Sequence, residues 1–556
     1  MTRNRLLLLT LLLCPLTLWG QGRGLDPAKL LNPLSDDWPT YSGDYTGRRY
    51  SALTQANRLT VKNLTLAWTM GLTPGAGNTD GRGRGGNAGN VIVGGEGTGD
   101  FGAGGGSGVK GTPLMVDGTL YVSTPDNAWA IDARDGRELW HYFWKTRGGT
   151  HIANRGMAIW NNYLYMATPD NYLVSLDART GKERWHKVVA DFNQQYFTTS
   201  APIVVGNHVI VGTGNDLDSP GFLLSFDAET GEEQWKFYTV PMNPGDPGLD
   251  TWASLEAARH GGGMPWLPGV YDPETKLYIF GTGNPIPAYT VGRGEGDNLF
   301  TCALIALNVE TGKMAWYFQT SPHDMHDWDS AQVPILIDAF IKGKKRKLVS
   351  TAARNGYFFT LDRVTGEHFV TSKYGSATNW AKSVDKGSVR RDPGKDPTVP
   401  GSIVSPPAGG TVNWEPPAYS PDTGLFYVSE RNGYSIFYLT DPDPRGSMGL
   451  GGKEEINVGN GGNFLTAIDY KTGKIAWRHR YPSGAGGGGG LLATAGKLVF
   501  AGDGGGNFVA HDAATGKPLW HSRIGQVTNA PITYRLDGRQ YVLVAVGDQL
   551  FTFVMY

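Results

Sequence analysis

The segment SPHDMHDWDSAQ, residues 321–332, concentrates side chains that can exchange protons or bind cations. It places carboxylates at Asp324, Asp327 and Asp329 and imidazoles at His323 and His326. Such a set suits a metal site or a general base. Taken alone, the segment is more typical of turn carboxylates with surface imidazoles, so other parts of the chain must decide between the two interpretations.

Two further oxygen donors stand in comparable places, each after an expected strand and within a Gly- or Pro-rich loop. They are Asp216 in GTGNDLDSPGF and Asn284 in YIFGTGNPIPAY. Hard cations such as Ca²⁺ take several oxygen ligands from carboxylates and amide carbonyls. If Asp216, Asn284 and Asp327 belong to successive units of one repeating fold, their loops converge, and together they predict a metal site.

A phrase that recurs along the chain predicts such a fold. The shortest spacings between its copies, 45 residues from 140 to 185 and 43 residues from 477 to 520, match one four-stranded propeller blade. We expect each copy to form the turn before a blade's fourth strand, with Asp accepting turn N–H groups, Gly at positive φ, and Trp packed on the neighbouring blade. The copies are AIDARDGRELW ending at Trp140, SLDARTGKERW at Trp185, SFDAETGEEQW at Trp235, ALNVETGKMAW at Trp316, TLDRVTGEHFV at Val370, AIDYKTGKIAW at Trp477 and AHDAATGKPLW at Trp520.

The two ends of the chain supply the remaining blade. An outer strand, LTLAW, ends at Trp68, and the C-terminal strands QYVLVAVGDQLFTFVMY lack a fourth strand of their own. Pairing them closes the ring and removes an open sheet edge. The sequence therefore predicts an all-β, eight-bladed β-propeller of four-stranded antiparallel blades, forming one domain over residues 23–556.

Three segments depart from the regular spacing. Loops at about 371–412 and 434–462 are expected to interrupt one blade. The Gly-rich insert at 75–108 is expected to form a mobile lid over the site, with an apolar anchor at Val91 to Val93. A solvated flexible linker is the alternative for this insert.

Composition limits the classes of function. The chain has 556 residues, a net charge of −1 and a pI of about 6.8, so no basic surface favours nucleic-acid binding. Its 80 Gly and 17 Trp residues favour tight turns and aromatic-rich strands over helices.

The N-terminal sequence MTRNRLLLLTLLLCPLTLWGQG is typical of a secretory signal peptide covering residues 1–22. A lipoprotein alternative would use Cys14, but Pro15 follows it and no small residue precedes it. Cys302 is then left without an intramolecular partner, and the sequence has no Cys-x-x-Cys-His haem motif. No later apolar run approaches the roughly 18 residues of a membrane span, so we expect a soluble periplasmic or secreted protein with no membrane span after signal removal.

The repeated phrase and the opening segment from DWPTYSGDYTGRRY to LTLAW resemble the pyrroloquinoline quinone (PQQ)-dependent alcohol dehydrogenases over nearly the whole mature chain. The resemblance implies that Asp327 is the catalytic base and that Asn284 and Asp216 bind the metal, although the family usually has Glu at the last of these places. Asp327 and Asp329 are also expected metal ligands, and Asp329 matches an extra acid that occurs in lanthanide-using and in sugar-oxidising relatives. The implied cofactors are PQQ and Ca²⁺, with a lanthanide as the alternative.

The same resemblance implies a set of contacts to the quinone. Trp266 matches the Trp that stacks beneath the ring, and Arg354 matches the Arg near its reactive carbonyl. The family's adjacent cysteine pair is replaced here by Gly149 and Thr150, and a Trp on the other side of the ring by Gly488. Further implied cofactor contacts are Lys110, which stands where many relatives have Glu, and Arg155, Thr199, Thr213, Gly214, Asn215 and Asn413.

The sequence therefore predicts a PQQ- and metal-dependent dehydrogenase that oxidises an alcohol or a sugar or polyol hydroxyl. Because the chain has no haem motif, we expect its electrons to pass to a separate c-type cytochrome. The alternative is a non-catalytic secreted propeller, a scaffold or binding module that keeps the repeats and has lost the quinone.

Overall fold

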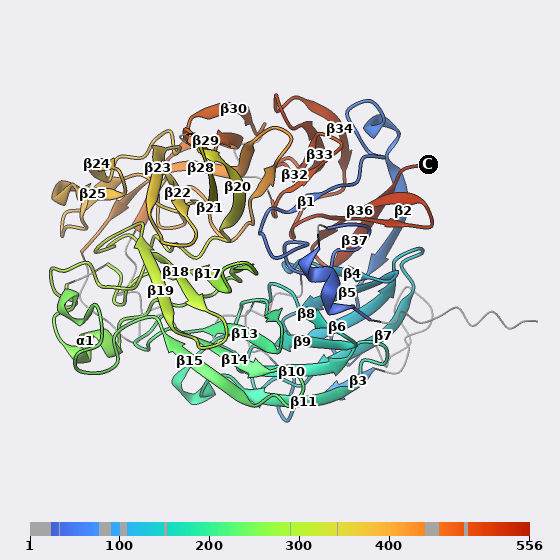
Figure 1. The fold of residues 1–556 in the computed structure, drawn as a ribbon, viewed down its shortest axis with the longest axis horizontal. Coiled ribbons are helices and arrows are strands. Elements are labelled where there is room, and N and C mark those ends of the chain that lie inside the picture. The colour runs from blue at the N-terminus through green and yellow to red at the C-terminus, as the bar shows by residue number, and fades with distance from the viewer. Residues whose placement is uncertain are drawn as a thin grey trace, which may run out of the picture.

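The computed structural model describes residues 24–32, 34–76, 91–100, 108–149, 153–289, 291–341, 343–439, 455–482 and 488–556. The expected signal peptide therefore lies outside the described residues. Figure 1 shows β-sheets arranged radially around a central axis, with the chain running once around the ring. Among the described residues no helix is long and apolar enough to cross a membrane.

Each blade is an antiparallel sheet whose strands follow one another from the axis to the rim. Eight such sheets form the ring. Their strands are β4 (Leu114–Val116), β5 (Thr119–Thr124), β6 (Asn127–Asp132) and β7 (Glu138–Trp144); β8 (Ala158–Trp160), β9 (Tyr163–Ala167), β10 (Tyr172–Asp177) and β11 (Glu183–Val188); β12 (Ile203–Val205), β13 (His208–Thr213), β14 (Phe222–Asp227) and β15 (Glu233–Tyr238); β16 (Val270–Asp272), β17 (Leu277–Gly281), β18 (Ala303–Asn308) and β19 (Met314–Gln319); β20 (Ile335–Ile341), β21 (Lys344–Ala352), β22 (Tyr357–Asp362) and β23 (His368–Lys373); β27 (Ala418–Ser420), β28 (Leu425–Phe437), β29 (Glu455–Asp469) and β30 (Ile475–Arg480); β31 (Leu492–Thr494), β32 (Leu498–Gly502), β33 (Asn507–Asp512) and β34 (Pro518–Arg523); and β35 (Ile532–Leu536), β36 (Arg539–Val546), β37 (Gln549–Val554) and β2 (Thr65–Gly71).

The last of these sheets closes the ring as the sequence predicts. Strand β2 pairs antiparallel with β37, with Trp68 opposite Thr552. The prediction of an eight-bladed, all-β propeller is confirmed. Strands from both ends of the chain therefore share this sheet, and the ring of blades is closed. The pairing with β2 covers the edge of β37 that would otherwise be open.

The repeated phrase joins each blade to the next. The indole N–H of Trp235 donates to the carbonyl of Val309 at 2.8 Å, and a Cβ added to Gly312 would lie 2.7 Å from the Trp235 ring. Gly312 has a φ of +66°, so glycine serves both the turn and the close approach of the indole. Where Val370 replaces the Trp, the hydroxyl of Ser372 donates to the next turn at Gly473.

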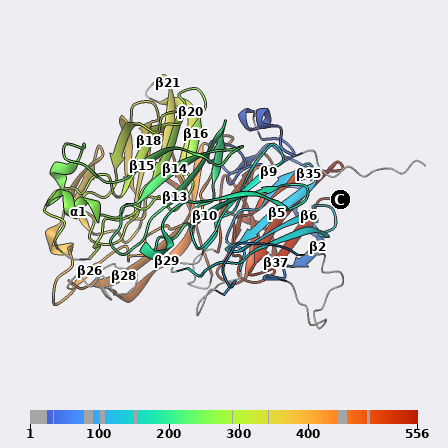
Figure 2. The same cartoon turned by 90° about the horizontal axis from the view of Figure 1, so that it is seen from below.

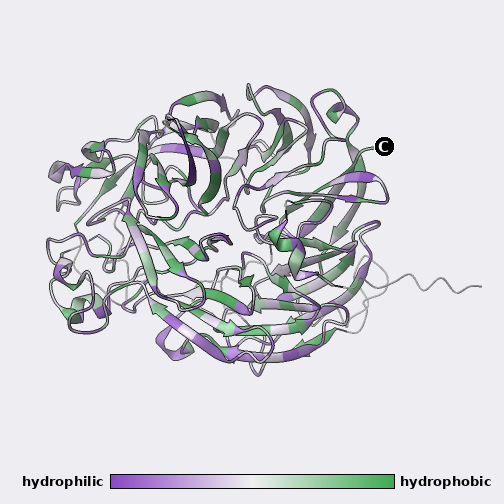
Figure 3. Ribbon diagram, viewed as in Figure 1, coloured by the Kyte–Doolittle hydropathy of each residue, from purple (hydrophilic) through white to green (hydrophobic). Residues whose placement is uncertain are grey.

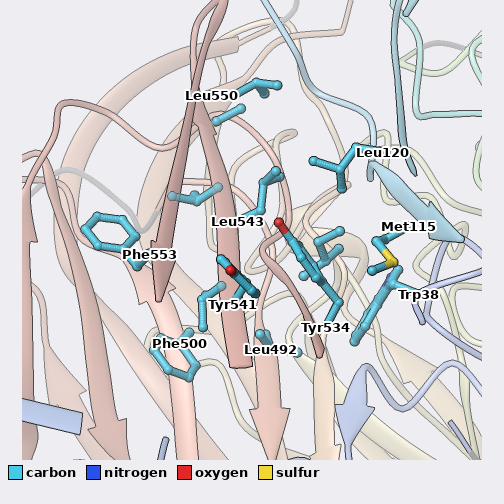
Figure 4. Packing of buried hydrophobic residues seen from close by; sticks show 14 of the residues in the cluster. Trp38, Met115, Leu120, Leu492, Phe500, Tyr534, Tyr541, Leu543, Leu550 and Phe553 are labelled. Carbon is cyan, nitrogen blue, oxygen red and sulfur yellow. The ribbon is translucent and has the colours of Figure 1, made fainter. Parts of the chain in front are cut away.

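Hydrophobic side chains fill the spaces between neighbouring blades. Figure 4 shows one such cluster, in which side chains from the first, seventh and last blades pack together, with Trp38 beside Met115 at one edge. Figure 3 shows that the outermost strands carry hydrophilic stretches, and the side chains of β11 and β15 are largely half-buried or exposed. Burial therefore increases from the rim toward the blade interiors, which gives the loops near the axis a rigid support.

The N-terminal segment crosses one face of the ring and enters its centre. It contains η1 (Pro27–Leu31), β1 (Tyr50–Ser51) and η2 (Val61–Asn63), and β1 pairs parallel with β31. The buried guanidinium of Arg49 donates to the carbonyls of Tyr41, Leu491 and Pro531 at 2.6–2.8 Å. This segment therefore ties separate blades together at the axis.

The sixth blade is larger than the sequence suggested. The expected loop at 434–462 contains the end of β28 and the start of β29, which pair as far as Phe437 and Glu455. The expected loop at 371–412 contains the hairpin β24 (Ala381–Asp385) and β25 (Ser388–Arg391), then η5 (Pro393–Lys395) and β26 (Ser402–Val404), which pairs with β28. The interpretation of these segments as plain loops was wrong for the parts that the structure describes, 371–412, 434–439 and 455–462.

The Gly-rich insert is also placed differently from the expectation. Strand β3 (Ile92–Gly94) pairs parallel with β7 and forms the outer edge of the first blade. The expected anchor of a lid over the site is therefore on the rim, and the lid interpretation was wrong for residues 91–100. Residues 77–90 and 101–107 lie outside the described residues. The short elements η3 (Phe192–Gln194), η4 (Leu249–Thr251) and α1 (Leu255–Arg259) lie in loops of the third and fourth blades.

Candidate active site

A cavity of about 300 Å³ lies near the axis, where loops that precede the innermost strands meet loops that follow the second strands. Asp216 and Asn284 follow β13 and β17, Arg354 follows β21, and Arg155 precedes β8. Because every blade runs in the same sense, these chain segments all lie at one face of the ring. Ten of the predicted residues line the cavity: Lys110, Arg155, Thr199, Asp216, Trp266, Asn284, Asp327, Asp329, Arg354 and Asn413.

Arg354 holds the two acids of the opening segment that reach the cavity. Its Nη1 donates to the backbone carbonyl of Asp327 at 2.7 Å. It also lies 3.3 Å from Asp327 Oδ1 and 2.9 Å from Asp329 Oδ2. Asp327 has a φ of +62°, an uncommon conformation for a residue with a side chain. The loop is thus turned so that Asp327 faces the cavity rather than solvent.

Asp329 organises the floor of the cavity. Its Oδ1 accepts the backbone N–H of Asn284 at 2.7 Å, and its Oδ2 accepts the indole N–H of Trp266 at 2.8 Å. Together with Arg354, these donors satisfy both carboxylate oxygens. Asp329 therefore fixes the plane of the Trp266 ring in addition to its expected place in the metal site.

Burial and mutual repulsion disfavour the charged forms of the carboxylates at this site. Burial raises the pKa of Asp327 well above its usual range, since the nearby Asp329 and Asp216 add to the shift and only Arg354 opposes it. Burial and then repulsion from Asp329 raise the pKa of Asp216 to about 7. Grouped acids with raised pKa values are stabilised in their charged form by a cation.

The donor set fits a hard cation, although it does not form a closed cage. No group of three or more closely converging His, Cys, Asp or Glu side chains occurs among the described residues. Asp329 accepts from Asn284, Trp266 and Arg354, so the candidate ligands with the most available oxygens are the carboxylates of Asp216 and Asp327 and the amide oxygen of Asn284. Two carboxylates and one amide are oxygen donors of the kind that Ca²⁺ and lanthanides take.

The opposite wall of the cavity is cationic and aromatic. The guanidinium carbon of Arg155 lies 5.5 Å from the Trp266 ring centroid and 4.9 Å from that of Trp414. No described carboxylate pairs with Arg155, and its buried Nε has no hydrogen-bond partner within the described chain. Burial lowers the pKa of Arg155 to about 10, and burial with repulsion from Arg155 lowers that of Lys110. An unpaired guanidinium between aromatic faces fits a flat, negatively charged ligand such as the tricarboxylated PQQ.

Three predicted contacts do not line the cavity. The hydroxyl of Thr213 donates to the carbonyl of Phe197 at 3.0 Å, and Gly214 packs against Met264. The side chain of Asn215 donates to the carbonyl of Gln194 and accepts from the backbone of residues 217–219. The side chains of Thr213 and Asn215 therefore shape the loop that carries Asp216, and a direct contact of these residues with a quinone stays a prediction.

The remaining titratable residues of the opening segment are structural. His326 stacks on Trp328 with ring centroids 4.2 Å apart, and its Nε2 lies 2.9 Å from the carbonyl of Lys395. Asp324 accepts the backbone N–H of Trp328 at 3.1 Å, as expected for a turn carboxylate. His323 Nδ1 lies 2.7 Å from the carbonyl of Gly296. The alternative interpretation, with surface imidazoles in this segment, does not hold for His326, which is buried.

The positions where the chain departs from the family pattern are partly described. Gly149 is described and does not line the cavity, whereas Thr150 lies outside the described residues. A Cβ at Gly488 would lie 2.3 Å from the carbonyl of Val527. No side chain fits at Gly488 without a backbone shift, so a ring like that of the family's Trp cannot stand there.

Sequence reasoning missed several residues of the cavity wall. Trp414 follows the predicted Asn413 directly and could have been found from that position. Phe197, Met264, Ala153 and Gly283 also line the cavity. The last four carry no polar signal, so only their place before or after a strand would have suggested them.

The comparisons with known proteins agree with this geometry. The family model described as "Glucose/ethanol/alcohol dehydrogenase, beta-propeller domain", of the PQQ proteins, matches residues 38–374 and 462–542. The chain belongs to the PQQ-dependent alcohol dehydrogenase family. Membership confirms the predicted quinoprotein alcohol dehydrogenase with PQQ as its cofactor and counts against a non-catalytic scaffold.

Relatives in this quinoprotein family resemble most of the chain. It is 35% identical to the quinohemoprotein alcohol dehydrogenase of Comamonas testosteroni, over 92% of this chain and 72% of that protein. It is 34% identical to the quinoprotein alcohol dehydrogenase PedH of Pseudomonas putida, over 90% of this chain and 84% of that protein. Among solved structures, the Comamonas enzyme has a TM-score of 0.82 at 30% identity, covering 96% of this chain and 82% of that chain. A europium-containing methanol dehydrogenase has a TM-score of 0.79 at 29% identity, covering 93% and 90%.

Proposed function

We propose that the protein oxidises the hydroxyl of a small alcohol to a carbonyl, with Asp327 accepting the hydroxyl proton. The observation that carries this proposal is the two-sided cavity, in which Asp327 and Arg354 face the unpaired Arg155. A scaffold protein has no need for an unpaired buried guanidinium beside a cluster of buried carboxylates. The relatives named as alcohol dehydrogenases support the substrate class.

Several residues of this chain would hold PQQ. Trp266 offers a flat face, and Arg155 with Lys110 offers positive charge to the quinone carboxylates. Thr199, whose hydroxyl lies 3.4 Å from the carbonyl of Trp266, and Asn413 offer further hydrogen bonds. When bound, PQQ supplies the two-electron redox chemistry that protein side chains lack.

Asp216, Asn284 and Asp327 would hold the metal ion, Ca²⁺ or a lanthanide. A metal ion here acts as a Lewis acid toward a carbonyl oxygen. Asp327 must be ionised at neutral pH to take a proton, whereas burial raises its pKa. Arg354 and an adjacent cation both favour the ionised form of Asp327 and so oppose the effect of burial on its pKa.

The electron acceptor and location complete the proposal. A relative from Thauera butanivorans is named 1-butanol dehydrogenase (cytochrome c), and this supports a separate c-type cytochrome as the acceptor. The N-terminal segment supports export to the periplasm with removal of residues 1–22. Sugar and polyol hydroxyls remain the second substrate class, favoured by Asp329 alone.

Reconstitution tests the proposal. Purified protein is supplied with PQQ and either Ca²⁺ or La³⁺, and oxidation of alcohols and of sugars is followed with a small electron-accepting dye. We expect turnover with short alcohols and little with sugars. Quinone binding without oxidation of either class would support the scaffold alternative, and faster oxidation of sugars would reassign the substrate.

A matched pair of variants tests the metal ligands. Asp216 lines the cavity, whereas Asp218, two residues away, is exposed and lines a separate groove. We expect Asp216→Ala to weaken metal affinity by at least roughly tenfold and Asp218→Ala to leave it unchanged. Equal affinities in the two variants, measured by titrating Ca²⁺ or La³⁺ into the quinone-loaded protein, would remove Asp216 from the site.

A further inference from the structure

The sixth blade carries an extra sheet beside the active-site cavity. It consists of β26, residues 432–437 of β28 and residues 455–461 of β29, and we refer to it as the blade-6 extension. Figure 2 shows β26, β28 and β29 on the side opposite the β20–β21 hairpin and the N-terminal helix. The blade-6 extension therefore projects from the face of the ring that carries the cavity.

The extension grows directly out of the cavity wall. The backbone N–H of Thr411 donates to the carbonyl of Arg354, and the N–H of Arg431 donates to the carbonyl of Thr411, both at 2.8 Å. At ~3.3 Å per strand residue, Ile436 lies about 16 Å beyond Arg431 along β28. The extension is thus joined to the residue that holds Asp327 by two consecutive hydrogen bonds.

One face of the extension covers the loop that carries Asp327. Ser402, Val404 and Phe437 on this face are buried. The Phe437 ring meets the His326 ring edge-on, with centroids 4.9 Å apart. This buried face explains why β26 and the long hairpin form strands, since they bury apolar side chains on the catalytic loop.

The other face of the extension is apolar and exposed. Ile403, Ile436 and Ile456 are direct cross-strand neighbours, and they form what we call the isoleucine row. Ile403 is 55% exposed and Ile456 51%, and nearby Val399 is 77% exposed. The charged side chain of Lys395, whose Nζ donates to the carbonyl of Ile403, lies beside the row. Exposed apolar side chains next to a charged group are typical of a protein-binding surface.

We propose that the isoleucine row is the docking surface for the one-electron carrier protein that reoxidises the enzyme, and this rests on the proposed function. Oxidation of one hydroxyl to a carbonyl releases two electrons and two protons. A one-electron carrier with an iron or copper centre therefore takes one electron per docking event and must dock and leave twice per turnover. Three aliphatic side chains suit such a transient contact, whereas an obligate dimer usually buries at least ~2,000 Å².

The position of the row supports this occupant over an unrelated partner. A carrier seated on it is separated from the Asp327 loop by a single sheet whose inner face contacts His326. The row belongs to the sixth blade, whereas Lys110 and Arg155 line the cavity from the first and second blades, so the row and the cationic wall of the cavity belong to different blades.

The test compares two acceptors in one enzyme. The double variant Ile403→Ser with Ile456→Ser removes the exposed apolar surface. The matched control is Leu139→Ser with Val188→Ser, two exposed aliphatic residues on β7 and β11, which belong to the first and second blades. Alcohol oxidation by quinone- and metal-loaded protein is measured with a small dye and with two purified carriers, a bacterial c-type cytochrome and the copper protein azurin.

We expect the double variant to lose roughly tenfold or more in kcat/KM for the carrier that wild-type protein reduces, through a raised KM for the carrier. Dye-linked turnover should stay within about twofold of wild type, and the control variant should lose neither activity. Unchanged carrier kinetics in the double variant, or an equal loss in the control, would overturn the proposal. So would a wild-type enzyme that reduces the dye and neither carrier.

Two other outcomes are distinguishable from these. Wild-type protein that sediments as a dimer and becomes a monomer in the double variant, with unchanged carrier kinetics, would assign the row to a second copy of this chain. Absence of dye-linked turnover in loaded wild-type protein would contradict the proposed function itself rather than the docking surface.

Discussion

The guanidinium carbon of Arg155 lies 4.9 Å from the ring centroid of Trp414, the residue that follows the predicted contact Asn413. The same guanidinium carbon lies 5.5 Å from the ring centroid of Trp266. A buried cation that is held by rings and has no described acidic partner keeps its charge available for a ligand. This relationship makes Arg155 the residue whose removal best separates quinone binding from catalysis.

We therefore expect Arg155→Ala to weaken PQQ binding by roughly 10- to 100-fold, the usual loss for a charge-assisted hydrogen bond. Binding is measured by quenching of tryptophan fluorescence, with no substrate present. Arg147→Ala is the control, because Arg147 stacks on Tyr172 and Phe192 rather than on the cavity rings. If Arg155→Ala binds PQQ as tightly as wild type, the cationic wall is not the quinone site.

The contact between blades predicts a stability effect at one glycine. Gly312 and Gly538 both have positive φ, +66° and +78°, but only Gly312 meets an indole ring, whereas no atom lies within 4 Å of a Cβ at Gly538. Alanine at either position costs about 1–2 kcal/mol from backbone strain. We expect Gly312→Ala to lower the thermal midpoint clearly more than Gly538→Ala, because it also displaces Trp235. Equal midpoints in a calorimetric scan would show that the indole contact adds little to stability.

Buried histidines predict how stability changes with pH. Burial lowers the pKa of His511 from 6.5 to about 4, and repulsion from His479 adds to the shift. Between these values the unfolded chain binds a proton that the folded protein does not, so stability falls as the pH drops from 6.5 to 4, by up to about 3 kcal/mol for this group.

The variant His511→Gln should therefore lose less thermal stability than wild type between pH 7 and pH 4.5. His141 and His326 have the same direction of shift, so the loss should be reduced rather than abolished. His521→Gln, at an exposed position on β34, should keep the wild-type dependence on pH. An unchanged slope in His511→Gln would mean that the His511 imidazole is protonated without cost.

The sequence was sufficient to predict the ring and most of the site. The spacing of the Asp–Gly–Trp phrase indicates that each copy belongs to one blade. The C-terminal strands lack a fourth strand of their own, and this predicts their pairing with the strand that contains Trp68. Asp216, Asn284 and Asp327 could be placed together because the repeat puts equivalent loops at one face. These inferences depend on the regular spacing of the repeats, which can be recognised in a single sequence.

Features that depend on distant partners were not predictable. The segment NVGNGGN, residues 457–463, has the composition of a loop, yet it is part of β29 because β28 pairs with it and Phe437 packs on His326. His326 is buried by Trp328 and by the carbonyl of Lys395, which is 69 residues away. The outer-edge pairing of β3 likewise depends on a contact with β7 that leaves no local pattern.

The central claim is that Asp327 is the base, and Asp327→Asn tests it most directly. The amide keeps the shape of the side chain and can still accept the Arg354 hydrogen bond, but it cannot take a proton. With saturating PQQ and metal, and with quinone affinity confirmed by fluorescence to stay within a few-fold of wild type, we expect dye-linked kcat for alcohol to fall by about 10²- to 10⁴-fold. Turnover at the wild-type rate in the loaded Asp327→Asn protein would contradict the account.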